Sequence, residues 1–162
     1  MDPIFVAHGT ATAIPIWFVT AANYAEVRER LSAGARVFAD AAGFEAKPGH
    51  YLALPGEGGL SGILFGLESA DDAKDLFLPG RLPQQLPSGV YRFANDPHDA
   101  RLAALAFAAG AYRFTRYHKS EGRKIKLDLP QSIDREDLER VVEAVTLVGG
   151  IVNWTPFALI SL

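Results

Sequence analysis

The chain has 162 residues, of which 49% are hydrophobic and 22% are charged. This length and balance fit one globular domain and exclude a chain that is disordered throughout. The absence of cysteine excludes a disulfide scaffold, a thiolate zinc site and a cysteine nucleophile. A net charge of -3 argues against a general binder of polyanions, but it leaves room for a local basic patch.

The beginning of the chain carries no recognisable targeting signal. The sequence MDPIFVAHG has an acid where a secretory signal has basic residues, and its apolar run is too short for such a signal. We therefore expect a cytoplasmic protein that does not enter a membrane.

The first half of the chain predicts two strands, a helical region and a hairpin. Apolar runs rich in Ile, Val, Phe and Trp predict strands at residues 4–7 and 14–20. Asn23 and Glu26 have capping-box spacing and predict a helix start. The helical region is expected to break near residues 32–34 and to stop at Gly43, with a buried side formed by Phe38, Ala39, Ala42 and Phe44. Residues 51–54 and 60–67 follow as an antiparallel pair, joined by the Gly-rich turn 55–59.

The second half predicts three further helices and two strands. A short helix is expected at residues 73–78, and a Pro-rich loop with one helical turn follows it. Residues 90–93 and 125–129 alternate as strands. Asp96-Pro97 predicts the start of an Ala-rich helix through Tyr117. Asp134 predicts the cap of the last helix, whose apolar stripe is Leu138, Val141, Val142, Val145 and Val148.

This succession of elements predicts an α/β fold: a single layered domain with a mixed β-sheet flanked by helices. The sequence has no catalytic, cofactor-binding or metal-binding motif. The four histidines at positions 8, 50, 98 and 118 lack metal-ligand spacing and are expected to be structural. The glycines at 56–62 lie between two strands, so they favour a hairpin turn over a phosphate-binding loop.

One segment concentrates positive charge. Residues 112–126 interleave aromatic residues with six basic ones, Arg113, Arg116, Lys119, Arg123, Lys124 and Lys126. Such interleaving suits a single-stranded nucleic-acid groove, but it is also typical of the solvated end of a helix. The acidic net charge favours the solvated helix end, and contact with nucleic acid stays the alternative.

The end of the chain is apolar. No charged residue follows Glu143, yet Gly149, Gly150 and Pro156 interrupt the run, which argues against a membrane span. A soluble domain is not expected to expose a cluster of large apolar side chains. The tail is therefore expected to pack back on the domain, to meet another subunit or to continue into more protein. An interface with a second copy or another partner would use Trp154, Phe157, Leu159 and Ile160.

Several segments together resemble one known family. They are FGLE at residues 65–68, LPGRLPQQLPSGVYRF at 78–93, VYRFANDPHDARLAALAFAAGAYRFTRY at 90–117 and KIKLDLP at 124–130, followed by a capped acidic helix. Residues 1–148 resemble the amino-terminal domain of the leucyl (cytosol) aminopeptidase family, in its proteobacterial form. The stretch 149–162 diverges from the family pattern as an apolar tail.

The resemblance implies a macrodomain-like α/β sandwich and an oligomeric assembly. It also implies that peptide hydrolysis belongs to a second, carboxy-terminal domain, which uses two divalent metals, Zn or Mn. No ligand of those metals can be assigned here, because the chain ends before their motifs begin. It therefore resembles a truncated gene product or a stand-alone relative of the first domain, with the catalytic domain absent.

Two functional hypotheses follow. The first is a non-catalytic amino-terminal-type domain of a metal-dependent leucyl aminopeptidase, acting in assembly or regulation, with a homo-oligomer or a catalytic-domain partner. The second is a binding module, for nucleic acid through residues 112–126 or for a nucleotide in a macrodomain-like cleft. The family as a whole consists of peptide hydrolases, but for this chain the resemblance implies no enzyme activity of its own and no cofactor.

Overall fold

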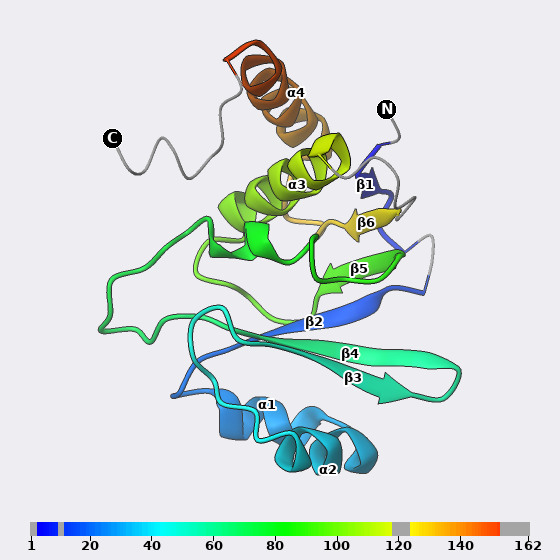
Figure 1. Cartoon of the computed structure of the whole chain (residues 1–162), viewed down its shortest axis with the longest axis vertical. Helices are drawn as coiled ribbons and strands as arrows, with labels where there is room; N and C mark the ends of the chain where they lie inside the picture. The colour runs from blue at the N-terminus through cyan, green and yellow to red at the C-terminus, as the bar shows by residue number, and fades with distance from the viewer. Residues whose placement is uncertain (1–2, 10–11, 118–123, 153–162) are drawn as a thin grey trace.

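A computed structural model describes residues 3–9, 12–117 and 124–152, which form a β-sheet with helices on both faces (Figure 1). In chain order the elements are β1 (Phe5–Val6), β2 (Ile14–Val19), α1 (Tyr24–Arg30), α2 (Ala33–Ala41), β3 (Tyr51–Gly56), β4 (Gly59–Gly66), the short 3-10 helix η1 (Leu78–Arg81), β5 (Gly89–Phe93), α3 (Ala100–Tyr117), β6 (Ile125–Asp128) and α4 (Arg135–Val152). The predicted α/β class with a mixed sheet is confirmed.

The strands lie in the order β1-β6-β5-β2-β4-β3. All neighbouring pairs are parallel except β3 and β4, which form the expected antiparallel hairpin. After β2 the chain continues through α1 and α2 to β3, on one side of β2. After β5 it continues through α3 to β6, on the other side. The connections therefore diverge at the carboxyl ends of β2 and β5, which is where open α/β sheets bind their ligands.

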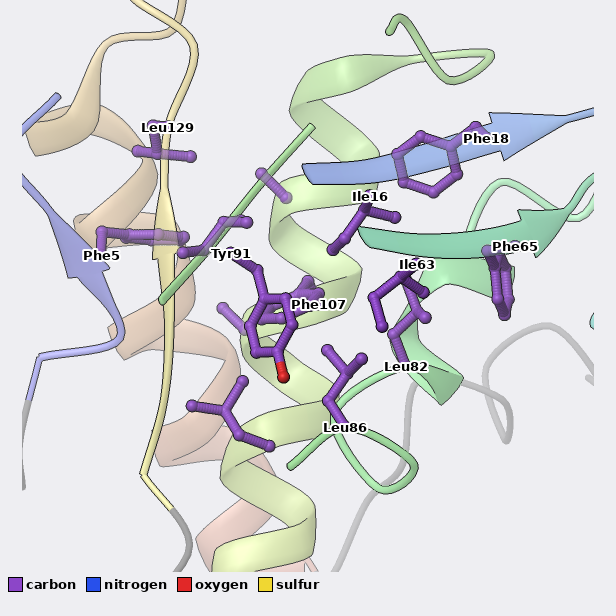
Figure 2. Packing of buried hydrophobic residues seen from close by; sticks show 14 of the residues in the cluster. Phe5, Ile16, Phe18, Ile63, Phe65, Leu82, Leu86, Tyr91, Phe107 and Leu129 are labelled. Atoms are coloured by element: carbon purple, nitrogen blue, oxygen red, sulfur yellow. The ribbon is translucent and has the colours of Figure 1, made fainter. Parts of the chain in front are cut away.

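Each face of the sheet has its own apolar core. On one face Phe18, Phe65 and Tyr91 pack with Phe107 of α3, and Figure 2 shows this core from Phe5 to Phe65. On the other face Val19 and Leu64 pack with residues of α1 and α2, namely Val27, Leu31, Ala35 and Ala39. The period of two along a strand divides neighbouring side chains between the two cores.

The loop before β5 is anchored on α3 through two glycines. A Cβ atom built on Gly110 would lie 2.1 Å from the carbonyl oxygen of Gly80, and one built on Gly80 would lie 2.9 Å from that of Ala106. Backbone therefore meets backbone where η1 crosses α3. Only glycine permits an approach this close.

Helix α1 begins after Asn23, as the sequence predicts, but its side-chain bonds differ from the expected ones. At α1 the reciprocal capping bonds join Thr20 and Asn23: Thr20 N donates to Asn23 Oδ1 at 2.7 Å, and Asn23 N donates to Thr20 Oγ1 at 3.2 Å. Asn23 is therefore the N-cap residue, but its side chain bonds back to Thr20 and makes no capping bond into the helix.

At α3 the capping residue is Asp99, whose Oδ1 accepts a bond from Leu102 N at 3.0 Å, and not Asp96. The backbone before it still follows β2, since Ala94 N donates to Ile16 O at 2.9 Å. The helix can therefore begin only after this pairing has ended. Asp134 caps α4 as predicted, with its Oδ1 accepting from Asp137 N at 3.2 Å.

The short helix expected at residues 73–78 is not formed. Asp75 Oδ1 accepts a bond from Phe77 N at 3.0 Å, while Asp75 N donates to Glu68 Oε2 at 2.8 Å. These bonds hold a turn in place of a helix, because they occupy groups that helical bonding would use. The helical turn expected in the following loop is η1.

The outer face of α2 is more apolar than the sequence suggests. Phe38 and Ala42, expected on the buried side, are exposed, whereas Ala39 is buried and Phe44 is half-buried. Ala35 and Ala39 are the residues that face the sheet. Their small size brings the helix close, and Val27 and Leu31 fill the remaining space from the α1 side.

Among the helices of the described residues, none combines the length and the apolar character needed to span a lipid bilayer.

Candidate functional site

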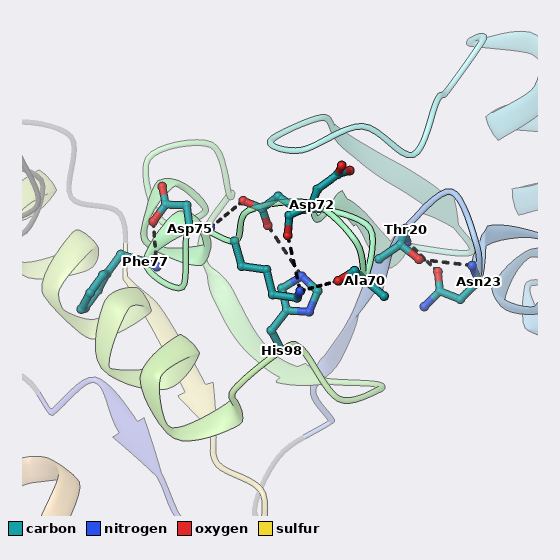
Figure 3. A network of polar contacts seen from close by, with 9 residues as sticks. Thr20, Asn23, Ala70, Asp72, Asp75, Phe77 and His98 are labelled. Carbon is teal, nitrogen blue, oxygen red and sulfur yellow. Dashed lines mark hydrogen bonds and ion pairs between the residues drawn. The ribbon is translucent and has the colours of Figure 1, made fainter.

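Polar side chains gather where β2, β4 and β5 end, at the divergence of the chain connections (Figure 3). Thr20 and Asn23 follow β2, Glu68 follows β4, and Asn95 and His98 follow β5. Five parallel strands direct their carboxyl ends the same way, so residues distant in sequence meet at this edge. We call it the carboxyl edge.

Asparagine amides bridge the gap between β2 and β5. Asn95 Oδ1 accepts a bond from Phe18 N at 2.8 Å, and Asn95 Nδ2 donates to Phe18 O at 2.7 Å. Asn23 Nδ2 donates to the same carbonyl at 3.4 Å. The amide of Asn95 thus continues the pairing of β5 with β2. Both asparagines therefore have a structural role at the edge where open α/β sheets bind their ligands.

Glu68 is a buried carboxylate at this edge, with a side chain 9% exposed. Its Oε2 accepts the bond from Asp75 N, whereas its Oε1 has no hydrogen-bond partner. Nε2 of His98 lies 3.6 Å from Oε1, and the His98 side chain is 19% exposed. The pair therefore connects segment 69–77 to the residues that precede α3.

The loops of the carboxyl edge are acidic. Besides Glu68 they carry Asp71, Asp72, Asp75, Asp96 and Asp99. Lys74 is bound within its own loop, with Nζ donating to the carbonyl oxygens of Ala70 at 2.9 Å and Asp72 at 3.5 Å. Such a surface repels phosphate groups. The nucleotide-cleft hypothesis thus finds no supporting charge here and stays a prediction.

A second histidine–carboxylate pair follows β1 and β6. His8 Nδ1 lies 3.0 Å from Asp128 Oδ1 and 3.3 Å from Leu129 O, and Gly9 N donates to Asp128 Oδ2 at 3.2 Å. Both neighbours of Nδ1 are acceptors, so Nδ1 is the ring nitrogen that donates to them. Asp128 is buried, whereas His8 is half exposed.

Neither pair is visible in the sequence, because their members lie far apart along the chain and share no motif spacing. His50 is exposed in the loop before β3, and His118 lies outside the described residues. Within residues 3–9, 12–117 and 124–152, no three His, Asp or Glu side chains come together as a metal centre would require. These residues therefore do not fit the two-metal site that the family resemblance implies for the catalytic domain.

The basic segment is only partly within the described residues. Arg113 on α3 and Lys124 at the start of β6 are exposed. Lys126 is half-buried, and its ammonium donates to Pro3 O. The side chain of Arg116 and residues Lys119 and Arg123 lie outside the described part. The nucleic-acid hypothesis therefore stays a prediction for these six residues.

The predicted tail interface of Trp154, Phe157, Leu159 and Ile160 also lies outside the described residues. Exposed large apolar side chains occur on α2 instead: Val37 is 68% exposed and Phe38 is 39% exposed. They are the only large hydrophobic residues so exposed in the part of the chain whose side chains are described.

Comparisons with known proteins place these features in a family. Residues 14–130 match the model of the M17 aminopeptidase N-terminal domain. The cytosol aminopeptidase from Coxiella burnetii is 25% identical, with a TM-score of 0.69 over 86% of this chain and 31% of that chain. A mutant of tomato leucine aminopeptidase, 17% identical, has the same fold, with a TM-score of 0.54 over 88% of this chain and 35% of its own. No match was found among curated proteins.

The chain thus spans about a third of the length of these two solved structures. The family match covers the sheet from β2 to β6 and includes the carboxyl edge. On this ground the chain belongs to the M17 aminopeptidase family and corresponds to its N-terminal domain.

Proposed function

We propose that this chain acts as a non-catalytic N-terminal-type domain in the assembly or regulation of a metal-dependent leucyl aminopeptidase. The observation that carries the proposal is the match of 86% of the chain to only 31% of a cytosol aminopeptidase, together with a family model for the N-terminal domain. In the same proposal, the aminopeptidase that the chain works with is an oligomeric, cytoplasmic enzyme. Its catalytic domain hydrolyses peptides with two divalent metals.

The contacts of the carboxyl edge support a structural role for its polar groups. The amides of Asn23 and Asn95 bond to the backbone of β2, and Oε2 of Glu68 accepts a bond from Asp75 N. Groups engaged in this way stabilise a scaffold, whereas an acid or base in catalysis must reach a substrate. The exposed apolar residues of α2 add a surface suited to contact with protein.

The test is an assay of the purified chain with a leucyl chromogenic amide in the presence of Mn²⁺ or Zn²⁺. We expect no hydrolysis above that of a mock purification from cells without the gene. Metal-dependent hydrolysis that follows the chain through two purification steps, and that disappears with a chelator, contradicts the non-catalytic role.

A further inference from the structure

The carboxylate of Glu68 is bound at only one of its two oxygens within the described residues. Oε2 accepts the bond from Asp75 N at 2.8 Å, whereas the buried Oε1 has no hydrogen-bond partner there. An oxygen in this situation is costly, because burial removes the water that would otherwise solvate it. The carboxylate therefore lacks one donor.

His98 lies just beyond hydrogen-bond distance of this oxygen (Figure 3). Its Nε2 is 3.6 Å from Oε1 of Glu68, whereas a bond between a charged nitrogen donor and a carboxylate measures about 2.7–2.9 Å. A movement of less than about 1 Å therefore closes the pair. Histidine ordinarily changes its charge between about pH 5 and 8, so pH determines whether the ring meets the carboxylate as a cation.

The position of segment 69–77 depends on the same carboxylate. Buried Leu67 and Leu78 hold the two ends of this segment, and its middle is exposed. The bond from Asp75 N to Glu68 Oε2 ties its second half back to the end of β4. Any group that fixes the carboxylate of Glu68 therefore also fixes the segment.

We propose that His98 and Glu68 form a latch that fastens segment 69–77 at mildly acidic pH and loosens it as pH rises. Near pH 6 the charged ring donates to Oε1 and holds Oε2 on Asp75 N. Near pH 8 the neutral ring attracts the carboxylate less, so the carboxylate turns toward water more often and releases the segment. Its release opens the carboxyl edge, where open α/β sheets bind their ligands.

The other charged groups at this edge keep their charge across the same range. Acidic side chains ordinarily titrate below about pH 5 and basic ones above about pH 10. The end of β2 contributes Thr20 and Asn23, which carry no charge. The charged groups are Asp71, Asp72, Lys74 and Asp75 on segment 69–77, Asp96 and Asp99 beside His98, and Arg101 of α3, which pairs with Asp137 of α4.

Hydrogen exchange of single backbone amides, followed by NMR, tests the latch in the full chain. The amide of Asp75 reports the segment directly, because it is the donor to Glu68. After correction for the effect of pH on chemical exchange, it should be protected at least about threefold more at pH 6 than at pH 8, because bonds of charged donors are the stronger ones. The amide of Ala94, which donates to Ile16 O, reports opening of the sheet and should change less.

Two substitutions remove the latch by different routes. His98→Asn takes away the group that changes charge, and Glu68→Gln keeps an acceptor for Asp75 N without the negative charge. Each variant should show equal protection of the Asp75 amide at pH 6 and pH 8. His50→Asn removes an exposed histidine before β3 and should keep the full dependence of the natural chain.

Equal protection of Asp75 at the two pH values in the natural chain overturns the latch. So does a dependence on pH that persists in His98→Asn, which folds independently of any defect caused by Glu68→Gln. An equal change at Ala94 shows a loss of overall stability and also overturns it. The latch goes beyond the proposed function and does not rest on it, so leucyl-amide hydrolysis by the chain contradicts that function without changing these outcomes.

Discussion

At the scale of single residues, Glu68 holds segment 69–77 in place. Its Oε2 accepts the backbone bond from Asp75, and its Oε1 faces His98. Truncating this buried side chain leaves the Asp75 N–H without its acceptor and removes the carboxylate beside His98. The cost of a buried donor without a partner is about 1–3 kcal/mol.

Glu68→Ala should therefore lower the free energy of unfolding by about 1–3 kcal/mol, measured by urea denaturation. Asp71→Ala removes an exposed acid from the same segment and should change it by no more than about 0.5 kcal/mol. Equal effects of the two substitutions contradict the role of Glu68 as the anchor of the segment.

Tyr91 gives the molecule a dependence on alkaline pH. Burial raises the pKa of its phenol to about 12, and the hydroxyl donates to Pro87 O at 2.7 Å. The same phenol has a pKa near 10 in the unfolded chain. Between these values the unfolded state loses the proton while the folded state keeps it, so stability falls as pH rises from about 10 to 12.

The free energy of unfolding should drop by about 2 kcal/mol across this range, since each pKa unit corresponds to about 1.4 kcal/mol and the phenol is half titrated at each end. Tyr91→Phe should reduce the drop, although it also lowers stability at neutral pH because a buried hydrogen bond is lost. Tyr112→Phe on α3 is the matched control. The same alkaline slope in Tyr91→Phe and in the natural chain rules out this residue as its origin.

At the scale of elements, the contact of η1 with α3 depends on Gly80 and Gly110. A methyl group on Gly110 would lie 2.1 Å from the Gly80 carbonyl oxygen, so one of the two backbones must move. Overpacking of this kind costs typically 1–3 kcal/mol, which far exceeds the gain in helix propensity from alanine.

Gly110→Ala should therefore lower the thermal midpoint of unfolding by at least about 4 °C. Gly34→Ala, at a helical position with no neighbouring atom within 4 Å, should leave it unchanged or raise it slightly. A stable Gly110→Ala variant contradicts the close approach of the two backbones.

The sequence predicts these elements better than it predicts their contacts. Periodicity finds the strands, α4 with its Asp134 cap and the extent of α3, because local burial patterns determine them. The start of α3 depends on the bonds of Ala94 and Asn95 to β2, which no local pattern encodes. The exposure of Phe38 likewise depends on how α1 fills the space beneath α2. The carboxylate partners of His8 and His98 are brought close only by the parallel sheet.

At the scale of the whole molecule, opposite charges lie at different places. The carboxyl edge is acidic, whereas Arg113 and Lys124 are exposed where α3 ends and β6 begins. The net charge of -3 opposes contact with a polyanion as a whole. We expect the basic residues to be solvated and to bind no nucleic acid.

Fluorescence anisotropy with a labelled single-stranded oligonucleotide tests this expectation. At 50 mM salt, where phosphate contacts are strong, we expect no binding at chain concentrations up to about 10 μM. Binding that weakens with salt and with Arg113→Glu favours instead the nucleic-acid hypothesis for residues 112–126.

The central claim is that the chain works with a leucyl aminopeptidase without being one. Its most direct test is co-expression of the tagged chain with the full-length cytosol aminopeptidase from Coxiella burnetii, followed by purification through the tag. We predict that metal-dependent leucyl-amide hydrolysis copurifies with the chain and does not copurify with an unrelated tagged domain of the same size. Purification of the chain free of this activity, with the enzyme left wholly in the unbound fraction, contradicts the claim.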